Sequence, residues 1–172
     1  MKLTKLVALV LVTTSVGSGA VLSNPMIGQA KRRPKTTIKT FPKAIRGKWY
    51  ARYYKMAGKP YYHEIKFTPK TASWKLNVGT NLVKQPLHAH KLPFHGSKTS
   101  QHQWVYAINA HDGTNVQNWN STITLPMAGY WRTRTKKYKG HKIKTLQRFN
   151  PKTKKASDVY YPSKKIASYY HK

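Results

Sequence analysis

The sequence contains no cysteine and only three acidic residues among its 172, namely Glu64, Asp112 and Asp158. Without cysteine there is neither a disulfide nor a lipid-modified N-terminal cysteine. Most glycosidases need two carboxylates, calcium and magnesium sites need several oxygen ligands, and a serine triad needs an acid behind its histidine. We read Asp112 in "HDGT" as a turn residue, Asp158 as a loop or strand-entry residue, and Glu64 as a cross-strand partner for a cation. We therefore expect no enzymatic activity and no cofactor.

Long apolar runs are also lacking, since no segment is long enough to cross a bilayer. The short run from Leu6 to Val12 follows Lys2 and Lys5 and precedes small residues, which is the layout of an export signal. Cleavage is possible after Ala20 or after Ala30. The second site is favoured because Asn24-Pro25 would break the signal helix upstream, so residues 1–30 are expected to be a signal peptide. An exported chain without cysteine indicates a bacterium, with a Gram-positive one favoured.

Positive charge is what the sequence has in excess, with 33 Lys and Arg and a net charge of +30. Loss of Lys2 and Lys5 with the signal peptide would lower +30 to +28. Such a charge costs stability through self-repulsion, so we expect the surface to meet anions outside the cell. Candidate partners are wall polymers of the teichoic acid type, anionic lipid heads and nucleic acid. The candidate polyanion-binding residues are Lys31, Arg32, Arg33, Lys35, Arg52, Arg132, Arg134, Lys136 and Lys137.

The pattern of apolar residues predicts strands. Residues 31–45 lack apolar periodicity and combine prolines with cations, which predicts an extended basic linker before a domain of residues 46–172. Beyond that point apolar residues alternate, as in "SWKLNV", where Trp74, Leu76 and Val78 share one face. The same pattern predicts strands over 47–54, 61–67, 103–109, 121–125, 129–135 and 143–149. Ile65 and Phe67 are expected to point inward in the second, and Trp104, Tyr106 and Ile108 in the third.

Turn-forming segments such as "MAGKP" and "KYKGHK" separate these strands, so we expect a single all-β, mostly antiparallel domain. The C-terminal "SKKIASYYHK" could form a short helix capped by Ser163, or a last strand. "FTPKTAS" at 67–73 returns as "FNPKTKKAS" at 149–157. We interpret this echo as a recurring hairpin formula rather than a duplicated domain.

Gly47-Lys48-Trp49, at the start of the first expected strand, resembles the Gly-x-Trp opening of lipocalin-like (calycin) barrels. The resemblance implies such a barrel, or a related barrel or sandwich, in which Gly47 and Trp49 form the floor. It also implies that an arginine of the last strand covers the tryptophan, Arg148 in preference to Arg134. In addition, "FPKAIRGKWY", "GYWRTRTKKYKGHK" and "YYPSKKIA" are similar to segments of small exported Lys/Tyr-rich proteins of lactobacilli.

"HAHKLPFH" contains His88, His90 and His95, which could approach a zinc ion, but two prolines favour a polar loop, and we expect no metal. The function favoured by the sequence is therefore nonenzymatic: a secreted cationic β-domain held at the envelope by anionic wall polymers. Three alternatives remain, namely a lipocalin-like carrier of a small apolar ligand, an extracellular nucleic-acid binder, and a cationic antimicrobial or adhesive factor.

Overall fold

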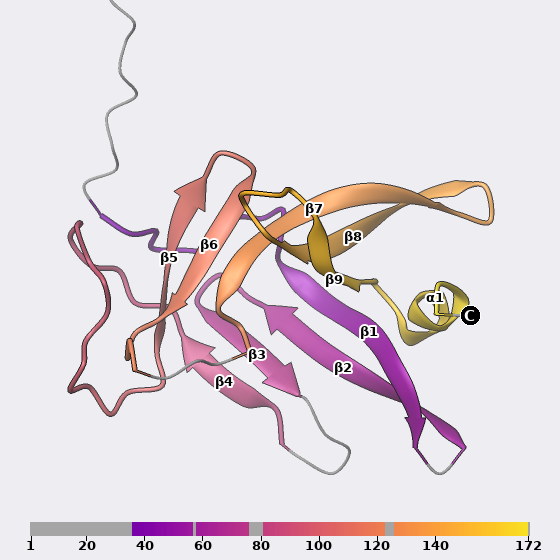
Figure 1. Cartoon of the computed structure of the whole chain (residues 1–172), viewed down its shortest axis with the longest axis horizontal. Helices are drawn as coiled ribbons and strands as arrows, with labels where there is room; N and C mark the ends of the chain where they lie inside the picture. The colour runs from indigo at the N-terminus through magenta and orange to yellow at the C-terminus, as the bar shows by residue number, and fades with distance from the viewer. Residues whose placement is uncertain (1–35, 57, 76–80, 123–125, 172) are drawn as a thin grey trace, which may run out of the picture. The chain divides into compact units, whose positions relative to one another are not determined.

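The computed structural model describes residues 36–56, 58–75, 81–122 and 126–171. These residues form nine strands and one short helix, and the strands make two antiparallel sheets (Figure 1). The first sheet has the order β1 (Gly47–Met56), β2 (Lys59–Phe67), β3 (Thr71–Lys75) and β4 (Val83–Pro86). The second has the order β5 (Val105–Ala110), β6 (Gly113–Asn118), β7 (Gly129–Tyr138), β8 (His141–Phe149) and β9 (Ala156–Tyr160). The prediction of an all-β, mostly antiparallel chain is confirmed.

The edges of the two sheets meet at two seams. At one seam Tyr50 of β1 exchanges two backbone hydrogen bonds of 2.8 Å with Tyr161, the residue after β9. At the other seam Leu87 bridges Val105 in parallel, and the His88 N–H donates to the Val105 carbonyl at 2.9 Å. Within the described ranges each seam is a single bridge, so the strands do not form a closed barrel.

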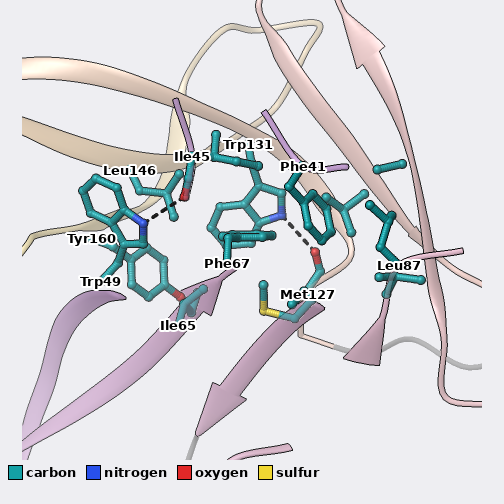
Figure 2. Packing of buried hydrophobic residues seen from close by; sticks show 14 of the residues in the cluster. Phe41, Ile45, Trp49, Ile65, Phe67, Leu87, Met127, Trp131, Leu146 and Tyr160 are labelled. Carbon is teal, nitrogen blue, oxygen red and sulfur yellow. Dashed lines mark hydrogen bonds between the residues drawn. The ribbon is translucent and has the colours of Figure 1, made fainter. Parts of the chain in front are cut away.

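The hydrophobic core lies between the inner faces of the two sheets (Figure 2). Trp49, Ile65 and Phe67 line it from the first sheet, and Trp131 and Leu146 line it from the second. Ile65 is opposite both Trp49 and Trp74 in the ladder, which places the three side chains on one face. The predicted inward positions of Ile65 and Phe67 are confirmed.

The segment before β1 is part of this core, so the prediction of a linker reaching residue 45 was wrong. Thr37, Phe41 and Ile45 are each at most 2% exposed. The Phe41 N–H donates to the Pro69 carbonyl at 3.0 Å, and the Phe41 ring meets Phe67 edge to face at 5.0 Å. Single apolar side chains that enter the core from an irregular segment leave no periodic pattern. The sequence pattern therefore could not show that these residues are buried. Residues 1–35, with the expected signal peptide, lie outside the described residues.

The inward face of β5 is the opposite of the one predicted. Val105 and Ala107 are fully buried against the core, whereas Tyr106 and Ile108 alternate to the other face of the sheet. Tyr106 is nevertheless only 5% exposed, because the loop of residues 88–104 covers it with Phe94. A strand apolar on both faces does not reveal its inner face by pattern alone.

The remaining predictions concern where strands begin and end and which structure the C-terminal segment forms. In the predicted strand 121–125, Ser121 and Thr122 form a turn and the remainder lies outside the described residues, as does the continuation of β3 beyond Lys75. β4, β6 and β9 were not predicted. Of the helix and the last strand that the sequence left open at the C-terminus, the structure shows the helix: α1 spans Lys164–Tyr169, and the Ser163 hydroxyl accepts from the Ile166 N–H at 3.3 Å.

Candidate polyanion-binding surface

All three carboxylates of the chain lie in the described part, and each is already paired. Glu64 contacts Lys48 at 3.3 Å, which agrees with the cross-strand role predicted for it. Asp112, in the turn between β5 and β6, contacts Lys154 at 2.6 Å and His111 at 2.9 Å. Asp158 contacts Arg148 at 2.6 Å. The remaining cations therefore have no acidic side chain available to neutralise them.

The densest group of these cations is at the end of the β7–β8 hairpin. We call it the hairpin cluster; it consists of Arg134, Lys136, Lys137, Lys139, Lys142 and Lys144. Lys137 and Lys142 are directly opposite each other in the ladder, where like charges destabilise the pairing. The hairpin turns through Lys139 and Gly140, which both have positive φ, 47° and 81°. A short turn and the ladder thus hold several repelling charges close together.

Aromatic rings from the C-terminal segment support this cluster. The Lys136 ammonium lies 5.7 Å from the Tyr161 ring centroid and 5.1 Å from that of Tyr170, and these two rings stack at 4.8 Å. Tyr138 meets Tyr169 edge to face at 4.9 Å, so the hairpin end lies beside α1 (Figure 1). Contacts of this kind hold a cation in place without neutralising its charge.

Helix α1 adds two cations to the same region. The Lys164 ammonium lies over the rings of Tyr50, at 5.8 Å, and Tyr62, at 5.4 Å, while Lys165 is exposed. Neither lysine was predicted as a site residue. Their signal in the sequence was "SKKIASYYHK", in which a capped helix places lysines in its first turn.

The structure brings together only some of the predicted binding residues. Arg134 and Lys137 are exposed on β7, and Lys136 lies beside them. Arg132, on the same strand, is engaged in the fold instead. Its Nε donates to Gln147 Oε1 at 3.2 Å, one Nη donates to the Lys154 carbonyl at 2.8 Å, and its guanidinium lies 4.2 Å from the Phe149 centroid. Burial lowers the pKa of Arg132 from its ordinary value.

Arg52 is half-buried in a pocket of about 270 Å³ between β1, β9 and α1, and its Nε has no hydrogen-bond partner. Tyr161 and Tyr170, whose rings contact Lys136, also line this pocket. The remaining predicted residues, Lys31, Arg32, Arg33 and Lys35, lie outside the described residues.

The predicted barrel-floor residues occupy two positions rather than one. Gly47 has φ of +131°, and Trp49, 4% exposed, donates its indole N–H to the Ile45 carbonyl at 3.0 Å. Arg148 lies over a different tryptophan, Trp131, at 6.0 Å from the ring centroid. Trp131 belongs to a second Gly-x-Trp, Gly129-Tyr130-Trp131, which lies in the predicted strand 129–135 and was not recognised in the sequence. Identical spacing to residues 47–49 was the signal that could have found it.

Arg148 also belongs to an interior polar group. Its Nε donates to Asp158 Oδ2 at 2.8 Å, and the Tyr53 hydroxyl donates to Asp158 Oδ1 at 2.8 Å. Burial raises the pKa of Asp158, but the Tyr53 hydrogen bond and the Arg148 charge outweigh it and hold that pKa below its ordinary value. The adjacent cavity, lined in part by Tyr53, His63, Trp74 and Arg148, has a volume of only about 60 Å³.

The histidines near residue 90 pack against aromatic rings. His88 and His102 stack on Trp104, at 3.7 and 3.8 Å between centroids, and His90 stacks on Phe94 at 4.2 Å. Burial lowers the pKa of His88, and the charge of His102 lowers it further. No group of three potential metal ligands occurs within the described ranges.

No helix in the described part of the chain has the length and apolar character needed to cross a membrane. No family model, curated protein or solved structure matches this chain. Its own fold and surface therefore define the class: an antiparallel two-sheet β protein with a concentrated cationic hairpin.

Proposed function

We propose that this protein is a secreted, nonenzymatic factor that associates noncovalently with anionic polymers of the cell envelope, of the teichoic acid type. The observation that carries the proposal is that every carboxylate is already paired while the hairpin cluster is not. A phosphate polymer would neutralise these cations and release their counterions, which is a large favourable contribution to binding.

The surface favours a flexible, repetitive polyanion over a shaped ligand. The hairpin cluster lies on a ribbon, and the contact of Tyr138 with Tyr169 places α1, which carries Lys164 and Lys165, beside it. A polymer with regularly spaced phosphates can contact such cations in many registers. DNA and anionic lipid share this chemistry and are the competing partners that an experiment must separate.

The interior supports this reading over a carrier of apolar ligands. The space between the sheets is filled by large side chains such as Trp131, Phe67 and Leu146, and the cavity beside Arg148 is small and polar. We infer that the two sheets represent a lipocalin-like barrel with open seams. The bridges of Tyr50 with Tyr161 and of Leu87 with Val105, together with the Gly-x-Trp at β1, support this inference.

Export is part of the proposal and rests on the sequence of residues 1–30. Cleavage after Ala30 would give a mature protein that begins at Lys31 with "KRRPK", which adds four cations to the chain before β1. N-terminal sequencing of the protein from culture medium and from salt-washed cells tests both the cleavage site and the location.

The binding experiment uses purified Gram-positive walls, intact and stripped of phosphate polymers. Intact walls should adsorb the protein at low ionic strength and release it as salt rises, and stripped walls should bind far less. Undiminished adsorption to stripped walls would reject the proposal. Strong competition by double-stranded DNA would favour nucleic acid as the partner.

A pair of variants with equal charge change locates the binding surface. The first replaces Lys137, Lys139, Lys142 and Lys144 of the hairpin with Gln. The control replaces four exposed lysines elsewhere, Lys43, Lys59, Lys66 and Lys84, in the same way. The hairpin variant should lose more wall affinity, with a salt dependence flatter by up to about 3 in log–log slope. Equal losses in both variants would show that net charge, and not the hairpin, determines binding.

A further inference from the structure

A pocket on the outer face of the second sheet differs from the rest of this cationic protein. It has a volume of about 390 Å³ and lies between the 88–104 loop and strands β5 and β6. Leu92, Phe94, Tyr106 and Ile108 form its apolar walls, and Asn115 and Gln117 form its polar side. Its size falls within the range of pockets that hold small molecules.

None of the described residues that line the pocket is a lysine, arginine, aspartate or glutamate, and the titratable side chains among them are His95 and Tyr106. An anionic ligand would find no compensating cation there, and a cationic ligand would find no carboxylate. The chain as a whole has a net charge of +30, so the lack of charged side chains is specific to this pocket. The ligand it fits is uncharged.

The polar groups of the pocket are suited to hydroxyl and amide partners. Asn115 and Gln117 alternate along β6 onto the outer face, opposite Ile108 and Tyr106 of β5. Gln117 Nε2 donates to Asn115 Oδ1 at 2.5 Å, which orients both amides and leaves the Asn115 NH₂ and the Gln117 oxygen for a ligand. The Tyr106 hydroxyl makes no hydrogen bond within the described part and is not among the buried unpartnered atoms, so it is accessible.

The apolar wall is held rigidly by the ring cluster behind it. The Phe94 centroid lies 4.8 Å from those of both Tyr106 and Trp119, and 4.2 Å from that of His90. A ring fixed in this way presents a preformed surface and loses little entropy when a ligand packs on it.

From this combination of neutral lining, fixed rings and a donor–acceptor amide pair, we propose that the pocket binds an uncharged saccharide ring carrying an N-acetylated amino group. The apolar face of such a ring packs against Phe94, while its hydroxyl and acetamido groups hydrogen-bond to Asn115, Gln117 and the Tyr106 hydroxyl. That this saccharide belongs to the wall glycan rests on the proposed function. The protein then contacts the same envelope twice, through the hairpin cluster and through this pocket. Linked contacts of this kind raise overall affinity beyond that of either site.

The two sites differ in how their affinity depends on salt, so an experiment can separate them. Polyanion binding weakens steeply as salt rises, whereas a contact between neutral groups does not. The probe is a soluble, uncharged oligosaccharide of N-acetylglucosamine, titrated into the exported form of the chain at low salt and at about 0.5 M salt, where charges are screened beyond about 4 Å. Isothermal calorimetry measures affinity, and tryptophan fluorescence reports through Trp119, which contacts Phe94.

The test variant is Asn115→Ala with Gln117→Ala, and the matched control is Asn109→Ala with Gln101→Ala, two exposed amides outside the pocket. We expect the same affinity at both salt concentrations, a loss of about tenfold or more in the test variant, and less than about twofold in the control. Thermal melting must show that both variants stay folded; if the test variant does not, Asn115→Asp, which brings an unmatched charge into the pocket, takes its place.

Absence of binding by the unmodified chain, or equal losses in test and control variants, would overturn the proposal. The hairpin lysine variant should keep its full affinity for the oligosaccharide. A failure of the wall-binding proposal would therefore appear as lost salt-dependent adsorption with saccharide binding intact, and a failure of the saccharide site as the reverse.

Discussion

Trp49 and Trp131 make the same hydrogen bond in two different sheets: each donates its indole N–H to the carbonyl four residues earlier, at 3.0 Å to Ile45 and 2.9 Å to Met127 (Figure 2). Each follows a glycine of positive φ, Gly47 or Gly129, by two residues. The next strand then ends at Phe67 or Phe149, before a Pro-Lys-Thr turn. The echo in the sequence thus corresponds to one hairpin design used once in each sheet.

Substitution of either tryptophan should destabilise the protein by a similar amount. Trp49→Ala and Trp131→Ala should each cost roughly 3–5 kcal/mol, because both remove a large buried ring. Phe at either position keeps most of the ring but leaves a buried carbonyl without its donor, which should cost roughly 1–3 kcal/mol. Denaturant unfolding measures these values, with Tyr54→Phe, at a residue that is 51% exposed, as the control. An unchanged midpoint for Trp49→Ala would reject its place in the core.

Asp158→Asn should destabilise the protein more than Glu64→Gln. Asp158 is 15% exposed in its side chain and pairs with Arg148, whereas Glu64 pairs with a lysine that is half exposed. The first change leaves a partly buried guanidinium unpaired and should cost roughly 1–3 kcal/mol, less than a fully buried pair would. The second should cost less than about 1 kcal/mol. Equal costs would show that the interior group contributes no more than a surface pair.

Stability should fall as the pH drops below about 6.5, the ordinary pKa of histidine. Burial lowers the pKa values of His88 and His63, so the folded protein holds both neutral at a pH where the unfolded chain takes up protons. Their contribution is complete above pH 6.5 and is lost as the pH falls toward their folded pKa values. His88→Gln should flatten the dependence of the melting temperature on pH between about 7.5 and 5.5. His141→Gln, at an exposed hairpin residue, is the control variant.

Lys142→Glu should stabilise the fold and weaken polymer binding at the same time. It converts the repulsion with Lys137 across the β7–β8 ladder into an attraction, for a gain of roughly 0.2–1 kcal/mol. It also removes positive charge from the hairpin cluster. Lys84→Glu on β4 changes the net charge equally but is opposite Ser73, so it should have a smaller effect on both properties. Melting curves and wall adsorption at one salt concentration measure the two effects.

The sequence predicted the strands that have one polar face, but it gave the wrong inner face for β5 and missed the short polar strands. β1, β2, β7 and β8 alternate clearly because one face packs on the core. β5 does not, because the 88–104 loop buries Tyr106 on the outer face. β4, β6 and β9 are short and mostly polar, and Phe41 enters the core from an irregular segment. For the candidate surface, composition predicted positive charge. It could not reveal that Arg132 makes hydrogen bonds within the fold, or that α1 brings Lys164 near the hairpin.

The bridge between Tyr50 and Tyr161 joins residues from opposite ends of the folded domain by two backbone hydrogen bonds. Contacts of such separation in the chain form late in folding, because a long loop must close before they gain anything. Until this seam forms, the edge of β1 is uncovered and is a template for pairing with another copy. The net charge of +30, which weakens each molecule alone, keeps such copies apart until the seam has formed.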